Sequence, residues 1–224
     1  MMHWTEYFGP LMEGAWVTVQ LTVLSTIFGA TLAFAAGIGK ISRNGAVRAL
    51  AITYIEVFRG TSLLVQLFWL YFALPIAGMA MGIDLRLPPL VAGIMALSLN
   101  IGAYGAEVVR GAIQSVHKDQ HEAARALNFT PRQTLWTVTI PQAVPEMMPS
   151  FGNLAVQNLK DTALVSLISL GDLAFRAEQI RNFTQDSTTI YSMLLLTYFG
   201  MALVLTAMMR LLEIRVSRWR TARS

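Results

Sequence analysis

The chain alternates between long apolar runs without charge and shorter segments that hold almost all of its Lys, Arg, Asp and Glu residues. Four runs are uninterrupted and reach the roughly 20 residues that a membrane-spanning helix requires. They cover residues 14–39, 60–83, 87–106 and 187–209. A fifth run, 147–171, is interrupted near its middle by two charged residues, and we count it as a span too. The pattern predicts an all-α protein, a polytopic transmembrane helical bundle with five spanning helices.

The predicted spans, extended to plausible helix ends, cover residues 14–39, 52–80, 87–112, 148–172 and 187–212. No internal repeat or low-complexity tract divides them, so residues 1–224 are expected to form a single transmembrane domain. Between the last two spans, apolar residues alternate with charges over residues 171–186, which indicates an interfacial helix. Because the number of spans is odd, the two termini are expected on opposite sides of the membrane.

Residues 117–141 form the only long polar segment between strongly apolar runs, so we expect this segment to lie outside the bilayer. Asp119 can act as the N-cap of a short helix, with Glu122 at the capping-box position three residues later. Asn128 is expected to end this helix, because Asn tolerates the left-handed conformation that often follows a last helical turn.

A second helix start follows directly after this turn. Thr130 has the N-cap position, Pro131 the first helical position and Gln133 the position that closes a capping box. Pro141 and Pro145 are expected to stop the second helix, because proline removes a backbone donor and clashes with the preceding turn. The segment therefore predicts a helix, a sharp turn and a second helix that project from the membrane.

Composition agrees with a membrane protein. The 224 residues are 54% hydrophobic and only 13% charged, whereas an ordinary soluble domain is about 25% charged. The mean hydropathy is +0.51. The chain has no cysteine, so it offers no disulfide, thiol nucleophile or cysteine metal site. Its net charge of +4 falls at the ends of the apolar runs, which points to membrane topology rather than to nucleic acid.

The distribution of Lys and Arg predicts the orientation. Basic residues gather after the first span, in the polar segment and in the C-terminal tail, whereas the opposite side is poor in them. The tail carries Arg210, Arg215, Arg218, Arg220 and Arg223. By the positive-inside rule these segments face the cytoplasm and the N-terminus lies outside. The N-terminus lacks a basic region and a cleavage site, so we expect a multi-pass protein of the bacterial cytoplasmic membrane without a removed signal peptide.

Lys160 and Asp161 are the most informative charged residues, because they interrupt a predicted span. Ionisable groups within a bilayer cost several kcal/mol unless they are paired or hydrated. One interpretation is that Asp161 and Thr162, with Lys160 beside them, line a substrate pathway and meet a ligand ammonium. The alternative is an internal ion pair, or a Lys160 side chain that extends to the interface.

Further polar residues lie within or beside the second and third spans. Asn100 and Tyr104 are four residues apart and share one helical face. We interpret them, together with Thr61, as candidate pathway residues, although hydrogen bonding between helices would explain the first two equally well. Glu56 and Arg59 are three residues apart, and we expect them to form a structural ion pair.

Catalytic and metal-binding patterns were not found. His117 and His121 have a metal-compatible spacing, but no HExxH pattern surrounds them, and no metal site is predicted. The nearest approach to a P-loop has Phe34 and Ile41 at the positions that require Gly and Ser or Thr. There is also no GxSxG elbow. The chain is therefore not expected to be an enzyme or to bind a cofactor.

The polar segment carries a resemblance to a known family. The pattern is formed by Glu122, Ala123, Ala124, Asn128, Val138, Ile140 and Pro141. It resembles the EAA loop of ABC importer permeases, and the segments YIEVFRGTSLLVQ, NIGAYGAEVVRGAIQSV and NLKDTALVSLISLGDL resemble the polar amino acid subgroup. The family usually has Gly at the position of Asn128, which is the next-best residue for a left-handed turn. The segments NIGAYGAEVVRGAIQ and ALNFTP are most similar to those of permeases for ectoine and hydroxyectoine.

The resemblance implies a type I ABC importer permease fold and an importer of polar amino acids or their derivatives. It implies that Glu122, Ala123, Ala124 and Asn128 contact a cytoplasmic ATPase dimer, which would use ATP and Mg. Phe129 is expected to be exposed because it lies next to the turn, and it is a candidate anchor for a pocket of that partner; packing against the permease's own helix ends is the alternative. A solute-binding protein outside and a second permease, identical or a sister chain, are the other implied partners besides membrane lipid. An ATP-independent secondary transporter or channel, and a membrane enzyme, are the alternative functions.

Overall fold

The computed structural model describes residues 4–221. Arg223 of the basic tail lies outside the described residues. The helices of the described part are α1 (Trp4–Lys40), α2 (Gly45–Gly60), α3 (Leu63–Phe68), η1 (Trp69–Ala73), α4 (Leu74–Ala80), α5 (Pro89–Ser115), α6 (Lys118–Ala126), α7 (Pro131–Gln133), η2 (Thr134–Thr139), α8 (Ile140–Asp161), η3 (Thr162–Ile168), α9 (Leu173–Thr184) and α10 (Ser187–Thr221). No strand occurs among these residues, which confirms the all-α prediction.

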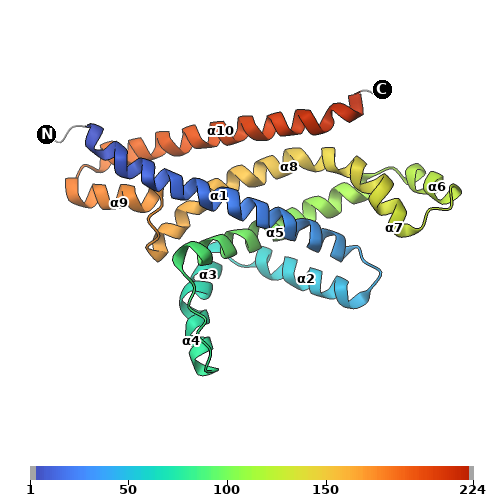
Figure 1. Ribbon diagram of the computed structural model, residues 1–224, viewed down its shortest axis with the longest axis horizontal. Coiled ribbons are helices and arrows are strands. Elements are labelled where there is room, and N and C mark those ends of the chain that lie inside the picture. Colours follow the sequence, from blue (N-terminus) through green and yellow to red (C-terminus); the bar gives the residue numbers. More distant parts are fainter. Residues whose placement is uncertain (1–3, 222–224) are drawn as a thin grey trace.

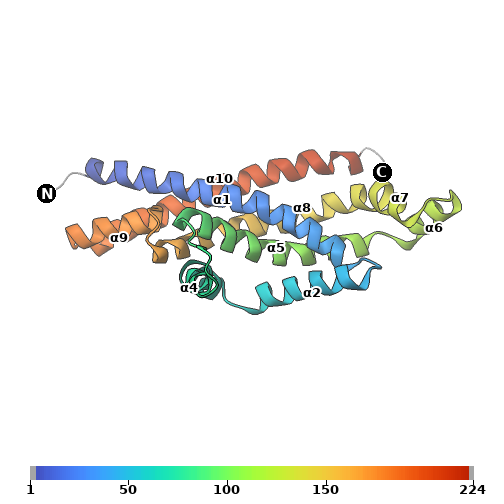
Figure 2. The same ribbon diagram turned by 60° about the horizontal axis from the view of Figure 1, so that its bottom comes forward.

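Four long helices, α1, α5, α8 and α10, lie side by side along the length of the molecule (Figures 1 and 2). Helix α9 lies at one end of this bundle and α6 at the other, and we call these the α9 end and the α6 end. The most extensive helix contact joins α1 to α5. It is close because glycine faces it: a Cβ on Gly29 would lie 2.2 Å from Ile101 Cγ2, and one on Gly105 would lie 2.7 Å from Ala33 Cβ.

The core consists of three apolar clusters spaced along the bundle. The first cluster joins α1, α3, α5 and η3, and it includes Leu21, Leu67, Leu97 and Ile168. The second cluster joins α1, α5 and α8 toward the α6 end. The third joins the start of α1 to α9 and α10. Apolar burial therefore holds one helical unit together from end to end.

Four helical segments are long and apolar enough to cross a membrane within the described residues. They are Tyr7–Lys40, Leu63–Ala80, Pro89–Ser115 and Ser187–Ser217, and they correspond to four of the five predicted spans. The remaining prediction, 148–172, falls on α8 and η3, whose sequence includes Gln157, Asn158, Lys160 and Asp161. Since α8 packs against α1, α5 and α10, these polar groups have protein neighbours, and the fifth span stays a prediction.

The second predicted span, 52–80, differs from the structure because it is not one helix. Helix α2 ends at Gly60, and Thr61 and Ser62 are extended, with ψ angles of 153° and 135°. Beyond this break, α3, η1 and α4 form an arm that leaves the bundle (Figure 1). The first span also differs, since α1 is already helical at Trp4 rather than at residue 14.

The prediction that Pro141 and Pro145 stop a helix is wrong, because α8 continues through both residues. The helix accommodates Pro141 by widening before it. Over η2 the turns are π-helical, and the Ile140 N–H donates to the Leu135 carbonyl five residues back. Wider turns of this kind adjust the backbone around the donor that proline lacks. As a result, residues 131–161 form one continuous helical rod.

Candidate functional site: a capped turn and a polar cavity

The turn after α6 has the geometry that the sequence predicted. Asn128 is left-handed, with φ of 59°. Its N–H donates to the Arg125 carbonyl at 2.9 Å, and the Phe129 N–H donates to the Ala124 carbonyl at 3.0 Å. These two bonds form a Schellman motif, which satisfies carbonyls at the end of α6. The turn is therefore a defined backbone structure rather than a loose loop.

The second capping box is confirmed and the first is wrong. The Thr130 N–H donates to Gln133 Oε1 at 2.8 Å, and the Gln133 N–H donates back to Thr130 Oγ1 at 3.3 Å. Helix α6, in contrast, begins at Lys118 after an extended His117, without a side-chain cap. Asp119 lies inside the first turn of α6, where a carboxylate is favoured by the helix dipole rather than by N-capping.

Side-chain exposure around the turn separates the predicted contact residues. Glu122 and Ala123 are exposed, whereas Ala124 is buried. Phe129, which its position next to the turn suggested would be exposed, is half-buried. Its neighbour Leu127 is 69% exposed instead. Leu127 was not predicted from the sequence; the signal that could have marked it is its place directly after α6, beside the left-handed turn at Asn128.

A cavity of about 410 Å³ lies between the α2–α3 break, α5 and α8. Its lining residues are Thr61, Ser62, Leu63, Leu97, Asn100, Ile101, Tyr104, Leu154, Gln157, Asn158 and Asp161. Four predicted pathway residues, Thr61, Asn100, Tyr104 and Asp161, therefore meet in one cavity although they come from three separate segments. The extended residues Thr61 and Ser62 form one wall of the cavity. Non-helical backbone within a membrane bundle is tolerated where it lines such a cavity.

Hydrogen bonds fix the wall around Asn100. Asn100 Nδ2 donates to Gln66 Oε1 at 3.2 Å, and Gln66 Nε2 donates to Thr61 Oγ1 at 2.8 Å and to the Phe58 carbonyl at 2.9 Å. Gln66 is buried, so this chain of bonds connects the extended break to α5. The bonding thus serves helix packing and cavity lining together, which were the two interpretations of Asn100.

Asp161 lines the cavity, but Lys160 and Thr162, the residues before and after it, do not. Gln157 Nε2 donates to Asp161 Oδ1 at 2.9 Å. Lys160 is exposed, and no ion pair joins it to Asp161 or to another described residue. Thr162 is fully buried and donates to the Leu159 carbonyl at 2.6 Å. The structure therefore does not bring Lys160 or Thr162 to the cavity, and the proposed internal ion pair is absent within the described part of the chain.

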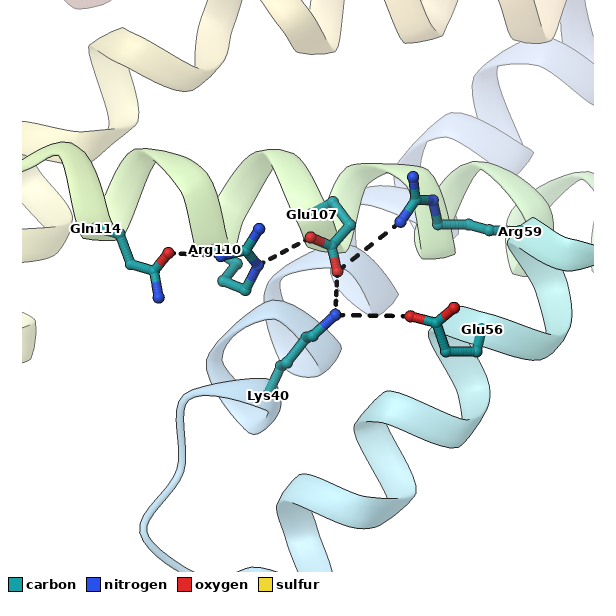
Figure 3. Close-up of polar contacts among 6 residues, drawn as sticks. All are labelled: Lys40, Glu56, Arg59, Glu107, Arg110 and Gln114. Carbon is teal, nitrogen blue, oxygen red and sulfur yellow. Dashed lines mark hydrogen bonds and ion pairs between the residues drawn. The ribbon is translucent and has the colours of Figure 1, made fainter.

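Figure 3 shows a cluster of charged residues around Glu107, which also includes Lys40, Glu56, Arg59 and Arg110. Glu107 Oε1 accepts from Lys40 Nζ at 2.5 Å, and Glu107 Oε2 accepts from Arg110 Nε at 2.8 Å. The predicted pair between Glu56 and Arg59 is wrong, because Glu56 lies 3.9 Å from Lys40 and Arg59 lies 4.0 Å from Glu107. Long-range partners on other helices compete successfully with the local one, which sequence spacing cannot show.

The cluster reaches the cavity through an aromatic ring. The Arg59 guanidinium carbon lies 5.4 Å from the centroid of the Tyr104 ring, which is within cation–π range. Tyr104 lines the cavity. Within the described residues there is no group of three or more His, Cys, Asp or Glu side chains that could hold a metal ion.

A bundle of apolar helices with a polar cavity between them is the architecture of a membrane permease, in which broken helices line a solute path. The chain belongs to the family described as binding-protein-dependent transport system inner membrane component, whose model matches residues 21–218.

Individual relatives agree with this membership. The chain is 67% identical over 219 residues to the probable amino-acid ABC transporter permease protein y4tF of Sinorhizobium fredii, covering 98% of this chain and 92% of that protein. It is 34% identical over 206 residues to the glutamine transport system permease protein GlnP of Escherichia coli, covering 92% of both chains.

A crystal structure of an amino acid ABC transporter with histidines superposes with a TM-score of 0.84 and 35% identity. The match covers 94% of this chain and 96% of that chain. The fold is accordingly that of a type I ABC importer permease, which confirms the expectation from the sequence.

Proposed function

We propose that this chain is the permease subunit of an ATP-driven importer that moves a polar amino acid, or a solute derived from one, across the cytoplasmic membrane. The observation that carries the proposal is the cavity that joins Thr61, Asn100, Tyr104 and Asp161 inside the helical unit. Its polar groups suit a small polar solute, and the relatives named for amino acids and glutamine support the substrate class.

The partner surfaces follow from the exposed parts of the fold. The capped turn, with Glu122 and Leu127 exposed, would contact an ATPase dimer that binds ATP and Mg. The arm carries exposed apolar side chains, among them Val65, Trp69 and Ile76, which suit a second permease or lipid. By the Lys and Arg distribution the α6 end faces the cytoplasm, and the α9 end would receive solute from a binding protein outside.

The continuous rod 131–161 provides a mechanical connection between the two sites. It starts at the capped turn and ends at Asp161, over about 45 Å at 1.5 Å per residue. A rigid helix transmits a displacement along its length, whereas a loop absorbs it. Movement of the turn by the ATPases would therefore shift the wall of the cavity, which is the coupling that alternating access requires.

The test is reconstitution of the permease with its ATPase and binding protein, which would be sought among the neighbouring genes. The binding protein is purified with its bound solute, which is identified by mass spectrometry, with ectoine and hydroxyectoine among the standards. We expect vesicles to accumulate that solute only when ATP is supplied. Uptake that persists with an ATPase unable to hydrolyse ATP would instead support a secondary transporter or channel.

A further inference from the structure

The charged cluster around Glu107 carries an excess positive charge. Three cations, Lys40, Arg59 and Arg110, face two carboxylates, Glu56 and Glu107. Glu107 is largely enclosed, with 19% of its side chain exposed, whereas Glu56 is 66% exposed. Water therefore screens the second carboxylate more than the first. Taken as a whole, the three cations and two carboxylates leave the cluster with one positive charge in excess.

Arg59 is the cation with unused hydrogen-bond donors. Lys40 and Arg110 each donate to one oxygen of Glu107, whereas Arg59 Nη1 remains 4.0 Å away. The Arg59 guanidinium donates no hydrogen bond to any other residue that the structure describes. It lies on the Tyr104 ring, and Tyr104 lines the cavity. A planar guanidinium with free donors at the edge of a cavity is suited to a carboxylate, which it can bind through two parallel hydrogen bonds.

The other end of the cavity has the opposite character. Asp161 has one hydrogen-bonding side chain, Gln157, and no ion-pair partner in the described part of the chain. Its neighbour Lys160 is exposed on another face of the helix. The carboxylate of Asp161 thus accepts one hydrogen bond but has no described cation within ion-pair distance, and an ammonium group in the cavity would be a suitable partner.

The two charges lie at different depths. A Cβ on Gly105 would lie 3.2 Å from Phe151 Cε1, and one on Gly93 would lie 2.9 Å from Val165 Cγ1. These contacts show that α5 and the α8–η3 segment run antiparallel and in register. Asp161 therefore lies beside residues about seven positions before Tyr104 on α5, which is about 10 Å along the axis. Asp161 is the charged residue of the lining and lies nearer the α9 end, whereas Arg59 adjoins the cavity through Tyr104, nearer the α6 end.

We propose that Arg59 is a carboxylate-binding residue of this cavity. The solute would lie with its carboxylate at Arg59 and Tyr104 and with an ammonium group at Asp161. Glu107 acts as the positioning residue, because its charge holds Arg59 near Tyr104 while Lys40 and Arg110 satisfy its oxygens. The inference rests on the proposed function and narrows it: the substrate is a zwitterion that enters with the carboxylate directed toward the α6 end.

The test uses a single thiol, because the chain has no cysteine of its own. Ser62 is exposed and lines the cavity, so Ser62→Cys reports on occupancy through its rate of reaction with a maleimide. The permease–ATPase complex is studied in nanodiscs without the binding protein, so that only the permease selects the ligand. Label on this chain is read after electrophoresis. The probes are the 20 common L-amino acids, and the most protective one is compared with its methyl ester and its N-acetyl derivative.

We expect both derivatives to protect at least tenfold less well than the free amino acid. In Arg59→Gln the amino acid should lose about tenfold in protection, and the disadvantage of the methyl ester should disappear, while that of the N-acetyl derivative remains. In Asp161→Asn the disadvantage of the N-acetyl derivative should disappear, while that of the methyl ester remains. Arg59→Lys keeps the charge but not the paired donors, so it should fall between wild type and Arg59→Gln, and it replaces Arg59→Gln if that variant does not assemble.

Arg48→Gln is the matched control, because Arg48 is exposed on α2, the helix that carries Arg59, and does not line the cavity. In this variant the free amino acid should still protect Ser62→Cys better than either derivative does, as it does with Arg59 and Asp161 unchanged. Discrimination against the methyl ester that survives in Arg59→Gln would overturn the inference. So would a failure of every amino acid to protect Ser62→Cys in a complex that still imports solute, although the proposed function would then stand. Absence of ATP-driven uptake in the wild-type complex would overturn the proposed function itself.

Discussion

Asn158 of α8 donates hydrogen bonds to Ser25 Oγ of α1 at 2.7 Å and to Thr26 Oγ1 at 3.0 Å. Only 3% of Asn158 is exposed, and it also lines the cavity. The contact joins helices that are more than 130 positions apart in the sequence. Because Asn158 is buried and bonded to two side chains of α1, this contact is a specific connection between the rod and α1.

Replacing Asn158 with Leu should weaken that connection. Two neutral hydrogen bonds are worth about 1–3 kcal/mol together, so the apparent melting temperature of the purified complex should fall. Asn153→Leu is the control, because Asn153 is exposed on the same helix and should change the melting temperature little. Equal melting temperatures for the two variants would show that the Asn158 contact does not contribute to stability.

Substitutions at Asn128 should follow its left-handed conformation. Glycine adopts φ of 59° without strain, so Asn128→Gly should keep full ATPase stimulation by the loaded binding protein. Valine is β-branched, and the left-handed conformation costs an L-residue about 1–2 kcal/mol. Asn128→Val should therefore lose most of the stimulation while the permease still assembles with the ATPase. Full stimulation in Asn128→Val would mean that the turn does not couple the two subunits.

Leu127 should contribute more to ATPase binding than Phe129. An exposed Leu next to a rigid turn has apolar surface to bury in a partner, whereas part of Phe129 is already covered. Leu127→Ser should raise the concentration of ATPase needed for half-maximal assembly by about tenfold, measured by co-purification from titrated membranes. If only Phe129→Ala has this effect, the anchor is Phe129, as its position in the sequence first suggested.

Asp161→Asn should abolish or strongly reduce uptake while membrane levels stay near normal. The change keeps the shape and the bond with Gln157 available, but it removes the negative charge from the cavity. Lys160→Gln is the matched comparison, because Lys160 is exposed and does not line the cavity. Unchanged uptake and selectivity in Asp161→Asn would remove Asp161 from the solute path.

Glu107→Gln should destabilise the α6 end of the bundle. The change leaves Lys40, Arg59 and Arg110 close together without the carboxylate between them, and charge-assisted hydrogen bonds are worth about 1.5–3 kcal/mol each. Thermal denaturation at low salt should show a clear loss for Glu107→Gln and a small one for Glu56→Gln, which removes an exposed partner. Similar losses for the two variants would argue against Glu107 as the centre of the cluster.

Local features of this protein were readable from the sequence. Four of the five predicted spans correspond to segments of the structure that are long and apolar enough to cross a membrane, because spanning length and hydropathy are properties of a local run of residues. The turn at Asn128 and the capping box at Thr130 were also predicted, since both depend on hydrogen bonds within a few residues. The resemblance at the same segment led to the family that the comparisons show.

Other features depended on contacts between distant segments. The helix passes Pro141 because the preceding turns widen, and the chain breaks at Thr61 where Gln66 and Asn100 bond across to it. Likewise, Arg59 lies beside Glu107 rather than Glu56. Asp161 faces the cavity and Lys160 does not, although the two are adjacent. The tertiary structure decides such choices because the competing partners lie on other helices, and sequence spacing carries no information about which of them come within a few ångströms.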